Sequence, residues 1–164
     1  MNVAVRSRVK PAQTRPASKQ RLRLWLRLLR ATRAIEAELR ERLRVQFQIT
    51  LPQFDVMAAL ARRDDGMSMT ELSRMLIVSN GNVTGIIDRL VADKLVARQP
   101  APHDRRSLVV KLTAKGQTQF ATIARAHQEW IDRVLADFDA AEAETVIQHL
   151  DGLPDRIRNG GARP

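Results

Sequence analysis

The sequence predicts a mainly α-helical fold that contains one two-stranded β-hairpin. Three observations support this expectation. Apolar residues recur at helical spacing along most of the 164-residue chain. Several of these stretches open with a capping residue that Glu or Gln follows three positions later, which is typical of a helix start. The helical period gives way to an extended pattern between Leu95 and Leu112.

The composition indicates a class of partner. Lys and Arg number 28 against 18 Asp and Glu, and the resulting net charge of +10 attracts polyanions such as nucleic acids. A basic protein that is merely soluble is the alternative. The absence of cysteine excludes disulfides, thiolate metal sites and thiol redox sensing. Aromatic residues make up only 4%, which favours an aliphatic, helical core.

The amino-terminal region divides into an arm and a helix. Residues 1–19 hold five basic residues, two prolines and no acidic residue, which predicts a disordered basic arm with either no role or a DNA contact. We expect residues 20–50 to form an N-terminal dimerisation helix and its connection, because the apolar stripe exceeds what one small domain covers. Arg23 and Arg27 interrupt the apolar residues, so neither a signal peptide nor a membrane span is predicted.

Residues 51–112 open with two helix starts that a short distance separates. Thr50 with Gln53 and Ser68 with Glu71 have the spacing of capping boxes. The second box precedes a short helix, a tight turn and a further amphipathic helix. Two short helices joined in this way form a helix-turn-helix, whose second helix lies in the DNA major groove.

A β-hairpin is expected directly after the helix-turn-helix. Leu95–Arg98 and Leu108–Leu112 are predicted to be strands, and Gln99–Ser107 a basic loop between them. A hairpin at this place is a wing, so residues 51–112 are predicted to be a winged helix-turn-helix DNA-binding domain.

The carboxyl-terminal region is predicted to hold two further helices. Residues 113–157 are expected to form C-terminal dimerisation helices, the first capped by Thr113 and the last ended by Gly152 and Pro154. Residues 158–164 are expected to be a frayed tail.

Candidate DNA-binding residues come from both elements. Asn and Thr hydrogen-bond bases and phosphates, glycine permits close approach, and arginine suits the minor groove. The alternatives are a frayed helix start and an ordinary charged turn. The candidates are Ser68, Thr70, Ser79, Asn80, Gly81, Asn82 and Thr84 in the helix-turn-helix, and His103, Asp104, Arg105 and Arg106 in the wing.

Residues from about 22 to 150 resemble the MarR (multiple antibiotic resistance regulator) family. The resemblance rests on the stretches TLPQFDVMAAL, MTELSRMLIVSNGNVTGIIDRLV and LVARQPAPHDRRSLVVKLTAKG. It implies a dimer whose N- and C-terminal helices interlock, a recognition helix in the major groove, and a wing in which Asp104 orients Arg106. The chain departs from the family at Lys94, where glycine is common, so Lys94 must either avoid a positive φ or accept its cost.

The segments SNGNVTG and AHQEW are similar to the subgroup that governs hydroxycinnamate and other aromatic-acid catabolism. That similarity implies a small effector, an aromatic acid or its acyl-CoA thioester, bound between the dimer helices and the DNA lobe. The alternative is that these residues bind no effector: a tryptophan at helical spacing is more often part of the core than of a ligand site, and arginines on an exposed helix usually form a solvated face. The candidate effector residues are Trp25, Arg30, Arg33, Met57, His127 and Trp130.

The sequence offers little for other functions. His103, His127 and His149 lack metal-ligand spacing, and no catalytic or phosphate-binding motif is present, so no metal, cofactor or enzymatic activity is expected. The expected function is sequence-specific transcriptional regulation in a bacterial or archaeal cytoplasm, associated with the nucleoid. A homodimer would repress a pseudo-palindromic operator until an effector released it. The alternatives are a ligand-independent architectural or activating DNA binder and a helix-turn-helix protein-interaction module.

Overall fold

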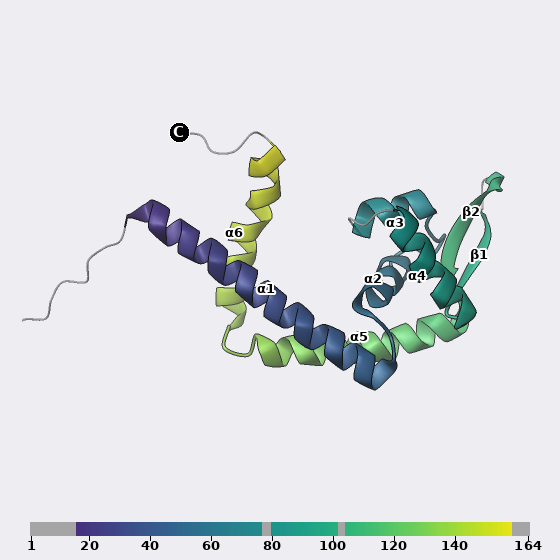
Figure 1. Ribbon diagram of the computed structural model, residues 1–164, viewed down its shortest axis with the longest axis horizontal. Coiled ribbons are helices and arrows are strands. Elements are labelled where there is room, and N and C mark those ends of the chain that lie inside the picture. The colour runs from purple at the N-terminus through teal and green to yellow at the C-terminus, as the bar shows by residue number, and fades with distance from the viewer. Residues whose placement is uncertain (1–15, 77–79, 102–103, 159–164) are drawn as a thin grey trace, which may run out of the picture. The chain divides into compact units, whose positions relative to one another are not determined.

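The computed structural model describes residues 16–76, 80–101 and 104–158; at 80–82 and 104–107 it describes the backbone alone. These residues form six helices and a two-stranded antiparallel sheet (Figure 1), which confirms the predicted mainly helical fold with a single hairpin. The chain falls into two compact units, Met1–Glu38 and Leu39–Pro164.

Helix α1 spans Ala17–Phe47 and supplies the described part of the first unit. It begins three residues before the predicted start at residue 20, because the N–H groups of Lys19 and Gln20 bond to the carbonyl of Pro16 at 2.9 and 3.2 Å. The last residues of the expected arm are therefore helical, while residues 1–15 lie outside the described part. The side chains of Leu22, Leu24, Trp25 and Leu26 are exposed.

The first two helices of the winged-helix lobe begin at the predicted capping boxes. Helix α2, Leu51–Leu60, starts with paired bonds between Thr50 and Gln53, and the amide of Gln53 is buried but satisfied. Helix α3, Met69–Leu76, starts where the Ser68 N–H donates to the Glu71 carboxylate at 2.8 Å and the Glu71 N–H donates to the Ser68 hydroxyl at 3.2 Å. The Ser68 N–H, followed by its hydroxyl, lowers the pKa of Glu71.

Helix α4 spans Asn80–Ala92 and leads into the hairpin of β1, Val96–Ala101, and β2, Asp104–Leu112. Both strands are longer than predicted, so the expected nine-residue loop Gln99–Ser107 is wrong: only residues 102–103 lie between them. Pro100 pairs with Leu108 just before a β-bulge. Proline is tolerated there because β1 is an edge strand and needs no outward N–H donor.

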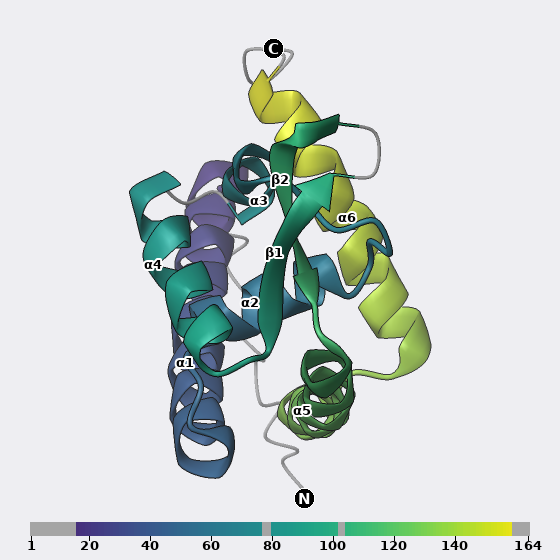
Figure 2. The same cartoon turned by 90° about the vertical axis from the view of Figure 1, so that its right-hand side faces the viewer.

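The hydrophobic core lies between the three short helices and the hairpin. In Figure 2, which faces the hairpin, α4 lies beside β1 and the start of α5 lies below the hairpin's base. A short bridge joins the other edge of β2 to the turn before α3, with Met67 and Val110 exchanging N–H···O bonds of 2.9 and 2.7 Å. The core residues are Val56, Met57, Ala59, Leu60, Met67, Leu72, Val83, Ile86, Ile87, Leu90, Leu95, Val96, Val110 and Leu112.

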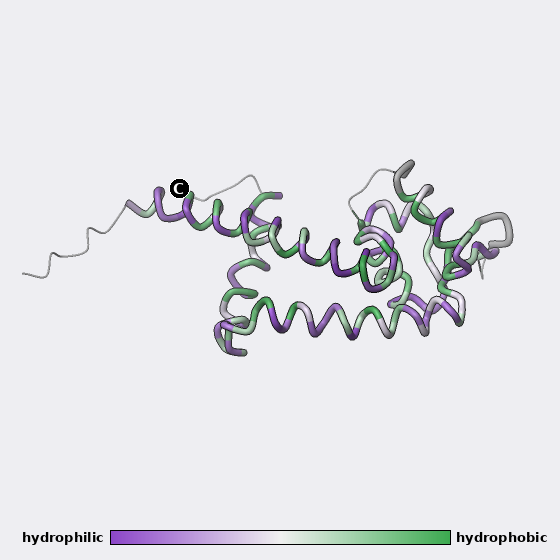
Figure 3. The backbone as a smooth tube through the Cα atoms, turned by 60° about the horizontal axis from the view of Figure 1, so that its bottom comes forward, coloured by the Kyte–Doolittle hydropathy of each residue, from purple (hydrophilic) through white to green (hydrophobic). Residues whose placement is uncertain are grey.

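Helices α5, Ala114–Val134, and α6, Ala140–Arg158, complete the chain. The predicted end of the last helix at Gly152 and Pro154 is wrong, because α6 continues through both. Pro154 removes one backbone donor, and this is tolerated because α6 has no buried residues and the carbonyl left unpaired is open to solvent. In Figure 3 hydrophobic and hydrophilic stretches alternate along α6, as in an amphipathic helix.

The first turn of α5 is seated directly on the turn between α4 and β1. Thr113 caps α5 by accepting the Gly116 N–H at 2.9 Å and donates its hydroxyl hydrogen to the carbonyl of Lys94 at 2.8 Å. A Cβ on Gly116 would lie 1.9 Å from the carbonyl oxygen of Leu95. Close approach of two backbones therefore explains the glycine in the Leu-Thr-x-x-Gly stretch.

We predict that Gly116→Ala lowers the free energy of unfolding by about 1–3 kcal/mol, because the added methyl group meets backbone that cannot move aside. Urea unfolding followed by circular dichroism measures this. Gly85→Ala is the matched control: a Cβ there meets nothing within 4 Å, so alanine should raise stability by about 0.5–1 kcal/mol. Equal effects of the two changes would contradict the close approach at Gly116.

Candidate nucleic-acid interface

Helix α4 packs one face on the core and leaves the opposite face open. Val83, Ile87 and Leu90 are fully buried. The exposed positions alternate with them and include Thr84, Gly85, Asp88 and Arg89. Because α3 and α4 are consecutive short helices packed on α2, this exposed face is the one that a helix-turn-helix presents to DNA.

The predicted base-reading residues fall at the start of α4. Asn80, Gly81 and Asn82 form its first turn, but their side chains lie outside the described part, as does Ser79 entirely. Thr84 follows one turn later and is exposed.

The two candidates at the start of α3 differ in what their hydroxyls do. Ser68 is half-buried, and its hydroxyl donates to the Glu71 carboxylate at 2.8 Å, so it serves the helix cap. Thr70 is exposed in the first turn.

The wing candidates sit on a strand. Asp104, Arg105 and Arg106 belong to the backbone of β2, and their side chains lie outside the described part. His103 lies outside it entirely. The structure thus puts the arginines in strand β2 instead of the loop that the sequence predicted, at the β-bulge between the pairs Pro100–Leu108 and Ala101–Asp104.

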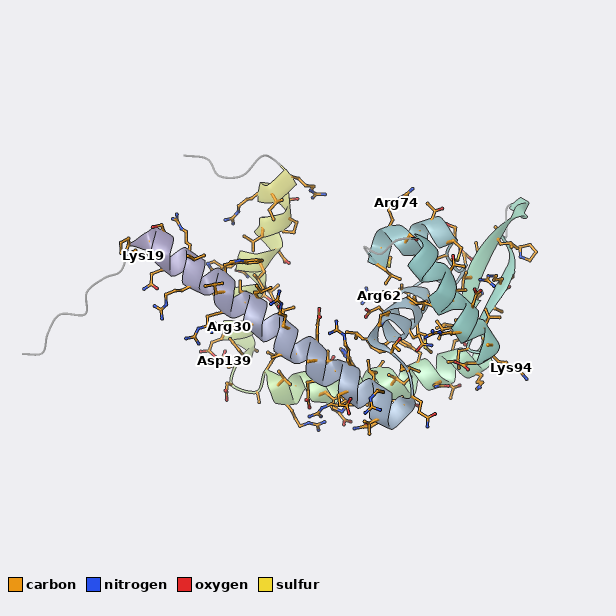
Figure 4. The ribbon with its side chains drawn as sticks, in the orientation of Figure 1. Lys19, Arg30, Arg62, Arg74, Lys94 and Asp139 are labelled. Carbon is orange, nitrogen blue, oxygen red and sulfur yellow. The ribbon has the colours of Figure 1, made fainter. Side chains whose placement is uncertain are left out.

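Lys94 ends the recognition helix in the left-handed conformation, with φ of 60°. The N–H of Leu95 bonds to the carbonyl of Leu90 and the N–H of Lys94 to that of Val91, both at 2.9 Å, which is the hydrogen-bond pattern of a Schellman cap. Lys94 therefore accepts the positive φ that glycine usually takes. The Lys115 ammonium donates to the carbonyl of Asp93 at 2.9 Å, which ties this cap (Figure 4) to α5.

Two of the candidate effector residues lie along α5. The His127 ring stacks on Phe54 of α2 with 4.6 Å between centroids and an angle of 20°. Burial lowers the pKa of His127, which favours the neutral imidazole. Trp130 is only 2% exposed, and the Arg42 guanidinium lies 5.7 Å from the centre of its ring.

The remaining effector candidates belong to other elements of the chain. Met57 is fully buried in the winged-helix core. Trp25, Arg30 and Arg33 belong to the first unit, where all three are exposed. The structure thus brings His127 and Trp130 together on one helix and assigns Met57 to the core.

Sequence reasoning did not indicate two adjoining hollows, of about 680 and 450 Å³, where the end of α1 meets the first half of α5; the end of α4 lines only the second. They share Phe47, Gln48, Lys115 and Gln119. A third hollow, of about 470 Å³, lies between the end of α5 and α6. Its apolar residues had a sequence signal, the helical spacing of Ile131, Phe138 and Ile147, whereas the first two arise from helix ends that meet only after folding.

The net charge of the protein is concentrated at one end of the chain. Ten of the 28 basic residues precede Glu36, which is the first of the 18 acidic residues, so residues 36–164 carry 18 of each sign. Among the described residues no cluster of His, Cys, Asp or Glu is arranged to hold a metal ion. In the described ranges no helix combines the length and apolarity that crossing a membrane requires.

A recognition helix with an open face, preceded by a short capped helix and followed by a two-stranded wing, defines a winged helix-turn-helix DNA-binding protein. Residues 47–107 match the profile of the MarR family. The chain is 33% identical over 130 residues to the transcriptional activatory protein BadR of Rhodopseudomonas palustris, covering 77% of this chain and 69% of BadR. The chain belongs to the MarR family and is a DNA-binding transcriptional regulator.

Two further relatives bear on function. The transcriptional repressor NicR of Pseudomonas putida is 30% identical over 115 residues, covering 70% of this chain and 72% of NicR. The structure of a mutant MarR from Escherichia coli complexed with operator DNA superposes with a TM-score of 0.69 at 26% identity, covering 85% of this chain and 99% of that one.

We predict that Gly85→Ala weakens DNA binding even though it stabilises the fold. Gly85 is exposed on the open face of α4, one position after Thr84, and a methyl group there keeps the helix backbone away from the groove. Fluorescence anisotropy with a duplex selected from a random pool by the wild-type protein measures the affinity. Ala92, exposed at the end of the same helix, offers Ala92→Ser as the control. Unchanged affinity of Gly85→Ala would show that this part of the face does not approach DNA.

Proposed function

We propose that the protein is a homodimeric repressor that reads a pseudo-palindromic operator and is released by a small aromatic effector. The observation that supports this best is the open face of α4 beside a basic wing in a member of the MarR family. In such a dimer the two recognition helices would lie about 34 Å apart, one turn of DNA, and read two half-sites. The proposed setting is a bacterial or archaeal cytoplasm, with the protein bound to the nucleoid.

The terminal helices support the dimer. The hollow between α5 and α6 is lined by Leu135, Phe138 and Ile147, which are 41%, 50% and 49% exposed. Residues 129–155 carry eight acidic residues and one basic residue, whereas the first half of α1 is basic and exposes Leu22 and Trp25. An apolar groove with acidic surroundings and an apolar helix with basic surroundings are complementary, which is what two copies of one chain need.

Repression is the proposed sign of regulation, and activation is the alternative, since NicR is named a repressor and BadR an activatory protein. A ligand-independent architectural protein and a protein-interaction module are the further alternatives. A salt titration separates the last of these, because a protein-interaction module shows no steep dependence of duplex-DNA affinity on salt.

An effector would act where α5 meets the DNA lobe. His127 contacts α2 and Trp130 contacts α1, so a ligand that changes their packing would alter the spacing between the dimer helices and the winged helix. The neutral imidazole of His127 would hydrogen-bond a phenol or a carbonyl, and Trp130 or Trp25 would stack on an aromatic ring. Arg30 and Arg33 are the candidates for binding the phosphates of an acyl-CoA thioester.

The first prediction here separates base reading from backbone contact. Asn82→Ala should weaken binding to the selected duplex by about 1–3 kcal/mol while leaving random duplex binding nearly unchanged, because a lost base contact carries sequence information. Arg106→Ala should weaken both, because minor-groove and phosphate contacts carry little. Asp104→Ala should resemble a milder Arg106→Ala. Anisotropy titrations with both duplexes check this, and equal losses on both duplexes for Asn82→Ala would remove it from the base-reading set.

The second prediction concerns release. We expect 4-hydroxycinnamate or its CoA thioester to dissociate the wild-type protein from its selected duplex, and His127→Ala and Trp130→Phe to need more effector for the same release. His149→Ala, which changes an exposed histidine of α6, is the control. Thermal unfolding of each variant is measured alongside. Variants that stay folded, bind DNA and respond like the wild type would place the effector site elsewhere.

A further inference from the structure

An ion pair joins the recognition helix to the wing. Asp88 lies on the open face of α4, one helical turn beyond Thr84, and its Oδ1 accepts a hydrogen bond of 2.6 Å from Nη2 of Arg98 in β1. The side chains of Asp88 and Arg98 are 56% and 36% exposed, so the pair lies at the surface. A carboxylate on this face would by itself repel DNA phosphates.

Both backbones that carry the pair are held firmly. Arg98 is paired across the hairpin with Val110, and Val110 is bonded on its other side to Met67. Asp88 follows Ile87, which is fully buried in the core. The ion pair therefore joins two fixed points, and it fixes where the guanidinium lies relative to the helix.

The guanidinium keeps donors for a second acceptor. Arginine offers five N–H groups in a planar fork, and among the described residues one bond is recorded for Arg98, from Nη2. Charged N–H donors to phosphate oxygens form strong, short hydrogen bonds. The guanidinium of Arg98 thus lies beside the recognition helix, held by one carboxylate. Its other N–H groups can still donate to a second acceptor.

From this geometry we infer that Arg98 contacts a DNA phosphate next to the recognition helix, and that Asp88 is the positioning residue that holds it there. The inference rests on the proposed operator binding and adds a contact at the base of the wing, outside the residues that sequence motifs indicate. The ion pair has two consequences for DNA binding. Asp88 orients the guanidinium, and Arg98 neutralises the carboxylate of Asp88 on a face that would meet the phosphates.

Stability measurements alone do not test this, because an exposed ion pair contributes only about 0–1 kcal/mol to folding. DNA binding tests it through the dependence of affinity on salt. Each phosphate contact adds about 0.9 to the slope of log affinity against log salt concentration. The loss of one phosphate contact per protomer is therefore measurable as a change in this slope.

The experiment compares Arg98→Gln, Asp88→Asn, the double variant and Arg98→Lys in anisotropy titrations at several salt concentrations. The probes are a duplex selected by the wild-type protein and a random duplex. Arg98→Gln should lose about tenfold in affinity for both duplexes and lower the slope by about one per protomer. Arg98→Lys should keep the slope and lose part of the affinity, because an ammonium lacks the planar fork.

The double variant identifies the role of Asp88. It should bind more tightly than Arg98→Gln, because the uncompensated carboxylate has gone. Asp88→Asn alone should keep the slope and lose part of the affinity for both duplexes alike, because the guanidinium remains but is no longer held in place. Glu41→Gln and Arg44→Gln are matched controls, since that pair on α1 also has an N···O distance of 2.6 Å and should leave the slope unchanged.

A wild-type slope for Arg98→Gln, or a double variant that binds no better than Arg98→Gln, would overturn the inference. A wild-type protein that does not distinguish the selected from the random duplex would instead contradict the proposed function. Circular dichroism of each variant confirms that it is folded before its slope is interpreted.

Discussion

The close contact between the first turn of α5 and the turn after α4 is the constraint on which the functional architecture depends. Gly116 brings the helix against the carbonyl of Leu95, and Thr113 and Lys115 donate to the carbonyls of Lys94 and Asp93 at the same place. The recognition helix, the wing and the long helix thus share one junction. A displacement of α5 must therefore move the end of α4 or break these contacts.

A second contact along α5 makes this coupling more rigid. Phe54 of α2 packs between Phe120 and His127, with ring centroids 5.9 and 4.6 Å away. Helix α2 packs against both α3 and α4. The long helix α5 therefore holds the lobe at two places, the turn after α4 and helix α2. A ligand that alters the packing near His127 would act on a lobe attached at two places, which is how small shifts become changes in the spacing of recognition helices.

Local signals in the sequence predicted most of the fold, because helix caps depend on residues three positions apart. Thr50 with Gln53 and Ser68 with Glu71 were predicted and form as expected. Local signals misled at Pro100 and Pro154, because tolerance of proline depends on whether the neighbouring backbone faces the outside of the fold. Lys94 left two outcomes open, and the tertiary contact with Thr113 accompanies the one with positive φ.

The site was predictable in kind but not in its contacts. The helix-turn-helix spacing located α4, yet the pairing of Asp88 with Arg98 joins residues ten positions apart in different elements and leaves no spacing signal. Met57 and His127 each lie on the apolar stripe of their own helix, but Met57 is in the core whereas His127 stacks on Phe54. These distinctions depend on which faces pack together, and periodicity alone does not determine that.

We propose that two copies of this chain read one operator. Sedimentation velocity of the protein mixed with its selected duplex, observed at the absorbance of a dye on the DNA, measures the stoichiometry directly. We expect a complex of two chains per duplex, formed from a protein that already sediments as a dimer at micromolar concentration. A saturated complex that contains a single chain would contradict it.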